Sequence, residues 1–226
     1  MNTLRARARD HEHLDEATLD PRDLRINLRE MAMLNRLPGG VGDSVRAVSG
    51  ALDGRAAPSV LDIGAGSGDF ARRLLRERRA TVLVADLRPE VLAIARRNLA
   101  NTNGVKFLRA DARALPLTDD AVDAVHASLL LHHLEPRDAV MALREMRRVA
   151  RDAVVINDLR RGRLAFLMAA TPVLAFTRGR YTRHDGVLSA RRAYTLAELD
   201  ALATEAGLRR VARTSAWWPR VTTVYR

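Results

Sequence analysis

The stretch that most constrains the fold of this chain is residues 60–70, which read VLDIGAGSGDF. A short apolar run carrying one acidic residue leads into glycines at alternate positions, and a helical stretch follows at residues 70–78. Glycine adopts backbone angles that are closed to other residues, and because it has no Cβ a ligand can lie against its main chain. The helix that follows points its free N–H groups at the same place. The run therefore predicts a buried strand, a ligand-binding turn and a helix.

The spacing of the glycines narrows the kind of ligand. Gly64, Gly66 and Gly68 follow Asp62 in a G-x-G-x-G pattern, whereas NAD enzymes seat a pyrophosphate with G-x-G-x-x-G. A short glycine turn behind an acidic side chain suits a ligand that carries a positively charged amino-acid moiety better than it suits a diphosphate.

Further apolar runs follow the glycine turn, and the first of them ends in an acidic residue. A carboxylate at a strand end can accept hydrogen bonds from both hydroxyls of a ribose, as it does in dinucleotide sites. In order and spacing, these runs together with the glycine turn resemble the class I S-adenosylmethionine (SAM)-dependent methyltransferases, and most closely the small-molecule enzymes of the ubiquinone/menaquinone-biosynthesis-like type. The runs are residues 81–86 (TVLVAD), 105–112 (VKFLRADA), 121–128 (AVDAVHAS) and 131–134 (LHHL).

The resemblance covers residues 56–158 well and implies SAM as the cofactor. It assigns the ribose hydroxyls to Asp86 and the adenine amino group to Asp111. The cofactor-binding residues that it implies are Asp62, Gly64, Ala65, Gly66, Gly68, Asp86, Leu87, Asp111, Ala112 and Ala127.

The alternation of short apolar runs with helical stretches predicts an α/β fold with a mostly parallel sheet and helices on both faces. In such a sheet ligands bind outside the carboxyl ends of the strands. The family resemblance makes this a Rossmann-like doubly wound sheet whose last strand is antiparallel. The remaining predicted helices span residues 89–100, 137–148 and 195–206, and the remaining strands span residues 154–156, 211–214 and 221–225.

The first 55 residues are predicted to form an N-terminal helical lid in front of a methyltransferase core at residues 56–226. Residues 1–20 show no apolar period and predict a mobile segment. Asp20 before Pro21 is typical of a helix start, and apolar residues recur at helical spacing up to residue 37. A second helix is expected at residues 41–52. By family resemblance both helices cover the active site; the alternative is that they pack on the sheet.

The most individual segment is residues 159–193, which we interpret as an acceptor-pocket insert. Its centre, residues 164–176, is apolar on all sides and flanked by arginines, and Pro172 is expected to kink or break it. The segment is too short to span a bilayer. It can form the wall of an apolar acceptor pocket, pack in the core, or lie at a membrane surface with its arginines on lipid headgroups.

Methyl transfer from a sulfonium requires alignment of the acceptor and then removal of a proton by a histidine or a carboxylate. His133, after the fourth strand, is the first candidate. His184 stands in a turn-like His-Asp-Gly sequence within the insert, and Asp158 ends the fifth strand. Tyr194 is a candidate for a hydrogen bond to the acceptor. Each histidine can equally have a capping or structural role.

Several functional classes are disfavoured by what the sequence contains. The 226 residues, 47% of them hydrophobic, suit one domain with a single substantial core, and with no cysteine there is no cysteine nucleophile and no thiolate zinc site. Residues 126–128 (HAS) offer no acid for the metal of catechol-type enzymes, so no metal is expected. The formal charge of +11 could attract nucleic acid, but its arginines are scattered and only 4% of residues are aromatic.

The sequence therefore predicts a cytoplasmic SAM-dependent methyltransferase that acts on a small, apolar or aromatic and possibly lipid-like acceptor, with at most peripheral membrane contact. Residues 24–40, 158–161 and 184–186 are similar to tailoring methyltransferases that accompany polyketide-derived phenolic lipids, which implies O-methylation of a phenol. The alternatives are a methyltransferase acting on RNA or protein, and a non-catalytic SAM-binding module.

Overall fold

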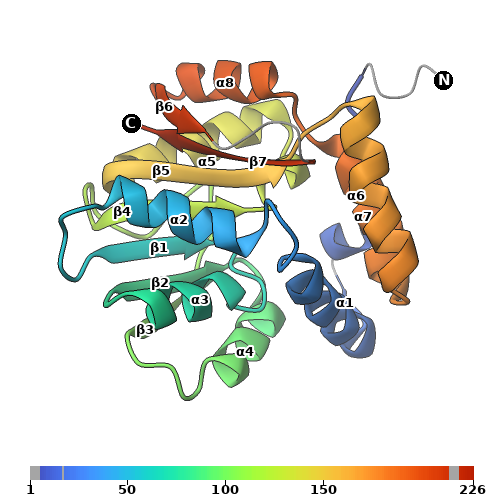
Figure 1. Ribbon diagram of the computed structural model, residues 1–226, viewed down its shortest axis with the longest axis horizontal. Helices are drawn as coiled ribbons and strands as arrows, with labels where there is room; N and C mark the ends of the chain where they lie inside the picture. The colour runs from blue at the N-terminus through green and yellow to red at the C-terminus, as the bar shows by residue number, and fades with distance from the viewer. Residues whose placement is uncertain (1–5, 17, 214–218) are drawn as a thin grey trace.

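The computed structural model describes residues 6–16, 18–213 and 219–226. A seven-stranded sheet in the order β3-β2-β1-β4-β5-β7-β6 forms the centre of the molecule (Figure 1). Strands β1 to β5 are parallel, whereas β7 runs antiparallel to both of its neighbours. The predicted Rossmann-like fold is thereby confirmed. The strands are β1 (Ser59–Ile63), β2 (Thr81–Asp86), β3 (Val105–Arg109), β4 (Val122–Ser128), β5 (Ala150–Leu159), β6 (Arg210–Arg213) and β7 (Arg220–Tyr225).

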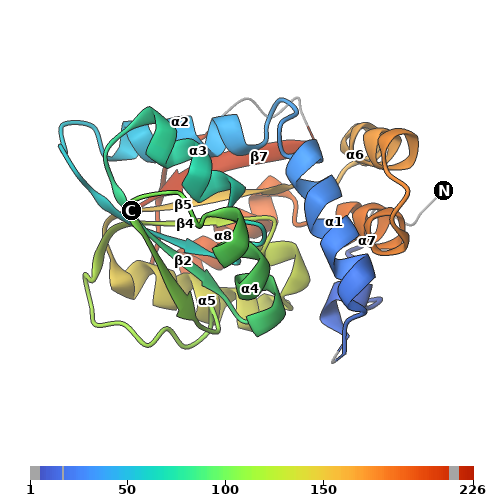
Figure 2. The same cartoon turned by 90° about the horizontal axis from the view of Figure 1, so that it is seen from below.

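Helices cover both faces of this sheet (Figure 2). One buried apolar cluster joins the sheet to α2, α3 and α4, and a second joins its other face to α5 and α8. Figures 1 and 2 both place α1, α6 and α7 beyond one end of the sheet. The helices are α1 (Pro21–Leu34), α2 (Val41–Ala51), α3 (Asp69–Glu77), α4 (Pro89–Asn98), α5 (Pro136–Val149), α6 (Arg163–Phe176), α7 (Arg180–Arg192) and α8 (Leu196–Glu205), with 3₁₀ turns η1 (His13–Asp15) and η2 (Leu131–His133).

Local sequence signals set the starts of two helices as predicted. The Asp20 carboxylate accepts hydrogen bonds from the backbone N–H groups of Arg22 and Asp23, and Pro21 takes the first position of α1. At α8, Thr195 and Glu198 form a capping box, in which each side chain accepts from the other residue's backbone N–H.

The two N-terminal helices differ in what they cover. α1 packs against α7, while α2 packs on β4, β5 and β7 and buries Val45 and Val48 in the core. The packing of α2 therefore agrees with the sheet-packing alternative. That α1 and the segment before it form a lid over the site stays a prediction.

The expectation that the N-terminal segment is mobile is wrong for residues 6–16. The Arg7 guanidinium donates to the backbone oxygens of His132, Leu134 and Arg192, and only 1% of Glu12 is exposed. Polar residues without an apolar period gave no sign of this packing, because the segment is held by hydrogen bonds and ion pairs instead of an apolar face.

Two local expectations for the insert differ from the structure. Residues 184–186 form no turn, because they lie inside α7. Pro172 does not break the apolar helix, since α6 continues to Phe176 and Thr177 still donates its N–H to the oxygen of Val173 at 3.2 Å; a kink at Pro172 stays a prediction. A proline near the end of a helix removes only one backbone bond, and packing against α7 holds the rest.

The glycine turn after β1 has the predicted left-handed backbone, with φ of 68° at Gly64, 54° at Gly66 and 78° at Gly68. A Cβ on Gly68 would lie 2.6 Å from Cδ1 of Leu99, a buried residue just after α4. Residues other than glycine therefore meet both backbone strain and a steric clash at Gly68.

We expect Gly68→Ala to lower the free energy of unfolding by about 1–3 kcal/mol, from the positive φ and the overlap with Leu99. Urea unfolding followed by circular dichroism measures this. Gly50→Ala is the matched control, because Gly50 lies in α2 with nothing within 4 Å of an added Cβ. That control should be neutral or stabilising. Equal effects of the two substitutions would contradict the strain at Gly68.

Candidate functional site

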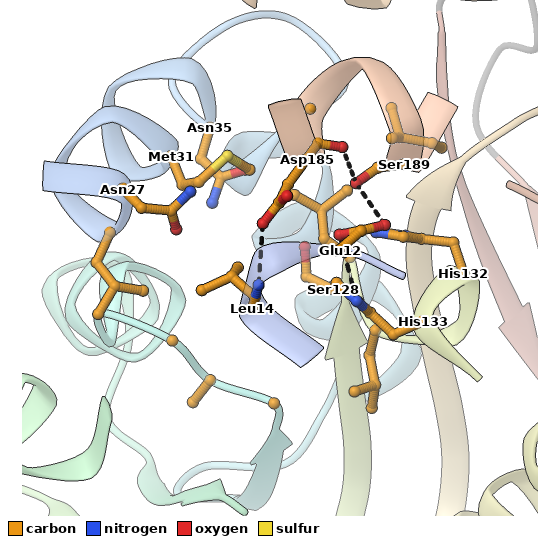
Figure 3. Close-up of a pocket in the computed structure, with 18 of the residues that line it drawn as sticks. Glu12, Leu14, Asn27, Met31, Asn35, Ser128, His132, His133, Asp185 and Ser189 are labelled. Atoms are coloured by element: carbon orange, nitrogen blue, oxygen red, sulfur yellow. Dashed lines mark hydrogen bonds and ion pairs between the residues drawn. The ribbon is translucent and has the colours of Figure 1, made fainter. Parts of the chain in front are cut away.

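A cavity of about 670 Å³ lies where the carboxyl ends of β1, β2 and β4 meet α1, α6, α7 and the N-terminal segment (Figure 3). It is the place at which ligands bind in open α/β sheets. Its wall combines the sheet edge with segments from both ends of the chain. After the ligands that the sequence predicts, we call the part formed by the loops after β1, β2 and β3 the cofactor half, and the part formed by residues 9–15, η2, α6 and α7 the acceptor half.

The cofactor half contains most of the residues that the family resemblance implied. Two of them do not line the cavity: Gly68 is the N-cap that precedes α3, and Ala127 is buried within β4, so that its neighbour Ser128 faces the cavity instead. Those that line it are Asp62, Gly64, Ala65, Gly66, Asp86, Leu87, Asp111 and Ala112.

Asp86 is oriented by the backbone around it. One carboxylate oxygen accepts from the N–H of Gly66 at 3.3 Å and the other from the N–H of Arg88 at 3.1 Å. Burial raises the pKa of Asp86, and these two hydrogen bonds oppose that shift. A carboxylate has about four acceptor positions, so Asp86 keeps capacity for ligand hydroxyls.

Asp62 is fully buried on the floor of the cavity, and burial raises its pKa. One of its oxygens bonds Nδ1 of His126 at 2.8 Å, and Nε2 of His126 bonds the Ser44 hydroxyl at 2.9 Å. Within the described parts of the chain, the second oxygen of Asp62 has no hydrogen-bond partner. An unsatisfied buried acceptor beside a glycine turn fits the ammonium group of an amino-acid moiety. Sequence reasoning gave no role to the side chain of His126, although it lies in the run at residues 121–128, and it did not single out Ser44, which lies in none of the runs that carry the resemblance.

Asp111 differs from the other two acids because it already has a cationic partner. Arg113 contacts it through both backbone N–H and guanidinium, the shortest contact being 2.6 Å, and these bonds hold the pKa of Asp111 below its usual range. Any amino group that binds Asp111 shares the carboxylate with Arg113.

In the acceptor half, His132 and Asp158 form a buried pair at η2. Asp158 accepts from Nδ1 of His132 at 2.6 Å and from the backbone N–H of Leu131 at 2.9 Å. Burial is the largest influence on the pKa of Asp158 and opposes its ionisation, but His132, the backbone N–H of Leu159 and the charge of Arg220 together outweigh burial and hold this pKa below its usual value. An ionised carboxylate only accepts, so the proton of neutral His132 sits on Nδ1 and Nε2 keeps a lone pair.

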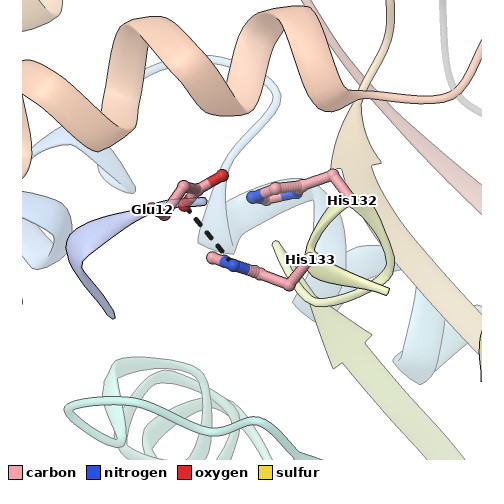
Figure 4. Close-up of side chains that lie close together, drawn as sticks. All are labelled: Glu12, His132 and His133. Carbon is pink, nitrogen blue, oxygen red and sulfur yellow. Dashed lines mark ion pairs between the residues drawn. The ribbon is translucent and has the colours of Figure 1, made fainter. Parts of the chain in front are cut away.

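His133, the first sequence candidate, also lines the cavity but has different partners (Figure 4). Its Nδ1 lies 3.4 Å from an oxygen of Glu12 and 3.2 Å from an oxygen of Asp15. Glu12 also accepts from the Ser189 hydroxyl at 3.1 Å. Burial raises the pKa of Glu12 to about 7, against the charges of His133 and Arg192.

The other sequence candidates lie outside the cavity wall. His184 is half exposed and bonds Asp185 at 2.8 Å, and it does not line the cavity, whereas its neighbours Asp185 and Gly186 do. Asp158 does not line the cavity, but it bonds His132, which does. The Tyr194 hydroxyl donates to the backbone oxygen of Leu134 at 2.7 Å.

α6 lines the acceptor half with one face and leaves the other exposed. The lining face comprises Met168, Ala169, Pro172 and Val173. On the outer face Leu164, Leu167, Leu174 and Phe176 are 49–69% exposed. Over the described ranges, no helix combines the length and apolar character needed to cross a bilayer.

Comparison with known proteins identifies the domain around the cofactor half. Residues 60–153 match the family described as a methyltransferase domain. Over this region the chain is similar to SAM-dependent methyltransferases. A demethylmenaquinone methyltransferase of Thermus thermophilus is 50% identical over 84 residues, which cover 35% of this chain and 37% of that protein. A ubiquinone/menaquinone biosynthesis C-methyltransferase of Hahella chejuensis is 35% identical over 102 residues, covering 43% and 40% respectively.

The methyltransferase fold extends beyond this domain match. A SAM-dependent methyltransferase structure from Aquifex aeolicus superposes with a TM-score of 0.64 at 17% identity, covering 92% of this chain and 98% of that one. The chain spans about two fifths of the length of the curated relatives that it matches. The family resemblance and the fold are confirmed, and SAM is the cofactor that they imply. The unsatisfied oxygen of Asp62 and the free acceptor positions of Asp86 fit it.

Among the residues that the structure describes, two groups of side chains could offer metal ligands. In each group the ligand atoms lie within 4.8 Å of one another, and the groups are Glu12 with His132 and His133, and His13 with His184 and Asp185. In the first group Glu12 contacts His133, and in the second His184 contacts Asp185, so these short distances are explained by hydrogen bonds and ion pairs without a metal. A metal-free site stays a prediction.

The raised pKa of Glu12 predicts a pH dependence of stability. Between its usual value near 4.5 and about 7, the unfolded chain has lost the proton of Glu12 while the folded protein keeps it. Folding then binds a proton, so stability falls as pH rises through this window. Glu12→Gln removes this titration. As the pH rises from 4.5 to 7, the free energy of unfolding of the variant should increase by up to about 3 kcal/mol relative to that of wild type.

Urea unfolding of wild type and Glu12→Gln at several pH values tests this. Glu90→Gln, at an exposed position on α4, is the control and should show a much smaller trend. A difference between wild type and Glu12→Gln that does not change with pH would contradict the buried, protonated state of Glu12.

Proposed function

We propose that this protein transfers the methyl group of SAM to a small, apolar or aromatic acceptor. The observation that carries the proposal is that the unsatisfied carboxylate of Asp62, the oriented Asp86 and an apolar wall from α6 line the same cavity. The names of the relatives support a small-molecule acceptor, because the two described above act in quinone biosynthesis by their names.

The division of the cavity supports separate binding of cofactor and acceptor. SAM supplies a methyl group on a sulfonium, with the glycine turn, Asp62 and Asp86 holding its amino-acid and ribose parts. Met168, Pro172 and Val173 exclude water from the acceptor half and pack against an apolar ring. Alignment of two reactants in this way can supply about 7–11 kcal/mol of barrier lowering in model reactions.

We assign the role of general base to His132, in place of His133. Nε2 of His132 has a lone pair, and no hydrogen bond to it is formed by the described residues. Asp158 fixes the ring and stabilises the charge that appears when Nε2 takes a proton, as the third member of a catalytic triad does. His133 instead has Nδ1 against Glu12 and Asp15, so it is held by two acids.

The finer proposal is O-methylation of a phenol. A base on the acceptor side can remove the phenolic proton, and the surrounding wall is apolar. By their names, the relatives differ in the atom that they methylate. The Hahella protein is named a C-methyltransferase, whereas a protein of Halorhodospira halophila is named a malonyl-[acyl-carrier protein] O-methyltransferase. The Halorhodospira protein is 42% identical over 91 residues, which cover 40% of this chain and 30% of that protein. A screen of phenols, quinols and acids with SAM separates these acceptors.

Calorimetric titration with S-adenosylhomocysteine tests the cofactor assignment. We expect one-site binding to wild type, weakened about 10- to 100-fold in Asp86→Asn, because an amide replaces a charged acceptor. The control is Asp53→Asn, at an exposed position far from the cavity lining, which should bind like wild type. No binding to folded wild-type protein would overturn the enzymatic proposal together with both alternatives, because a methyltransferase acting on RNA or protein and a SAM-binding module also need the cofactor.

The base assignment predicts how turnover responds to substitution. His132→Gln should lower kcat about 10²- to 10⁴-fold with little change in affinity for S-adenosylhomocysteine. Asp158→Asn should act in the same direction and shift the pH profile of kcat, because it no longer fixes the proton on Nδ1. His184→Gln is the control and should keep wild-type turnover. A larger loss in His133→Gln than in His132→Gln would return the role to His133.

A further inference from the structure

Arg220 is a buried cation in the wall of the cavity. It begins β7 opposite Leu159, the last residue of β5, and because β7 is antiparallel, this start lies at the carboxyl edge of the parallel strands. Its exposed fraction is 8%, and it lines the cavity close to Ser128 at the end of β4.

Among the described residues, the Arg220 guanidinium donates three hydrogen bonds, all of them to neutral side chains. Nε donates to the Asn157 carbonyl oxygen at 3.0 Å, one terminal nitrogen donates to the Asn35 carbonyl oxygen, and the other donates to the Ser128 hydroxyl at 2.8 Å. Figure 3 shows Asn35 and Ser128 at the cavity. A guanidinium has five N–H donors, so donors remain for a ligand.

No carboxylate of the described residues lies within 4.0 Å of Arg220, and residues 1–5, 17 and 214–218 include no Asp or Glu. Other buried arginines of this chain have an acid at contact distance: Arg192 lies 2.7 Å from Asp15, and Arg161 lies 2.6 Å from Glu198. A buried charge without a counter-ion is costly. Arg220 is therefore the exception among these buried cations.

The charge on Arg220 persists despite its burial. Burial lowers the pKa of Arg220 to about 10, while Asp158, Asp69 and Asp43 act in the opposite direction from beyond contact distance. The guanidinium is thus cationic at neutral pH. The polar cage of Asn157, Asn35 and Ser128 holds its plane in place, as a preorganised anion site requires.

Asn35 connects Arg220 to the cofactor half. Its amide nitrogen donates to Asp69 at 2.9 Å, and Asp69 is the first residue of α3 after the glycine turn. Arg220 and Asp62 therefore present a cation and an unsatisfied carboxylate oxygen in the same cavity. These two charges are complementary to the carboxylate and ammonium groups of an amino-acid moiety.

We propose that Arg220 is the binding residue for a carboxylate or other oxyanion in this cavity. The oxyanion is either the carboxylate of the methionine moiety of SAM or an acidic group on the acceptor. The identity of the ligand rests on the proposed function, whereas the need for an anion rests on the unpaired guanidinium.

The experiment compares wild type, Arg220→Met and Arg220→Lys by calorimetry. The methionine variant keeps the length of the side chain but removes its charge, and the lysine variant keeps the charge but loses the planar set of donors. Arg97→Met, at an exposed position on α4, is the control. The probes are S-adenosylhomocysteine, decarboxylated SAM, which lacks the carboxylate but keeps the amine, and benzoate added to the complex with S-adenosylhomocysteine. Thermal unfolding identifies any variant that does not fold.

If the cofactor carboxylate binds Arg220, the affinity of Arg220→Met for S-adenosylhomocysteine falls about 10- to 100-fold, and its affinity for decarboxylated SAM equals that of wild type. Arg220→Lys then has an intermediate affinity for S-adenosylhomocysteine. If the acceptor supplies the anion, S-adenosylhomocysteine binds both forms alike and benzoate binds wild type but not Arg220→Met. Should Arg220→Met not fold, Arg220→Lys gives the same comparison with a smaller effect.

Two results would overturn the inference. In the first, no probe distinguishes the variants from wild type. In the second, Arg220→Met binds S-adenosylhomocysteine and decarboxylated SAM more weakly by the same factor, which would make Arg220 a structural residue only. Failure of wild type to bind S-adenosylhomocysteine would instead overturn the proposed function, so the two failures are distinguishable.

Discussion

A continuous hydrogen-bond network buried at the carboxyl edge of the sheet joins the two halves of the cavity. It begins at Asp62 on β1, which holds the proton of His126 on Nδ1, so that Nε2 of His126 accepts from the Ser44 hydroxyl on α2. Ser44 accepts in turn from the amide of Asn157 on β5 at 2.8 Å. Asn157 accepts from Arg220 on β7 at 3.0 Å. These hydrogen bonds link β1, β4, α2, β5 and β7 in turn. The network therefore helps to hold α2 and β7 in place relative to β1.

The same network determines how the cavity is charged. Its first member, Asp62, has an unsatisfied oxygen, and its last cation, Arg220, has no acid at contact distance among the residues that the structure describes. Neutral Asn157 and Ser44 separate the two charges, so neither cancels the other. Buried polar networks that are only partly satisfied are costly, and here the unsatisfied groups face a cavity of about 670 Å³. A zwitterionic ligand would satisfy both ends at once.

Sequence patterns predicted the cofactor half much better than the acceptor half. The glycine turn and Asp86 follow buried strands directly, so strand prediction alone places them at the cavity. The choice between His132 and His133 could not be made from the sequence, because adjacent residues in a 3₁₀ turn point to different partners. One meets Asp158 and the other Glu12. Glu12 had no signal at all, since its segment carries no periodic pattern.

The sequence by itself determined the sheet, its helices and the turn that receives the cofactor, because these depend on apolar periodicity, caps and left-handed glycines within a few residues. Only the tertiary structure decided the acceptor half and the surroundings of Arg220, because both bring together residues that are far apart in the chain. Arg220 and Asn35 are separated by 185 positions, and Ser189 and Glu12 by 177. Burial and charge pairing at such distances follow from packing of whole elements, and no local pattern encodes them.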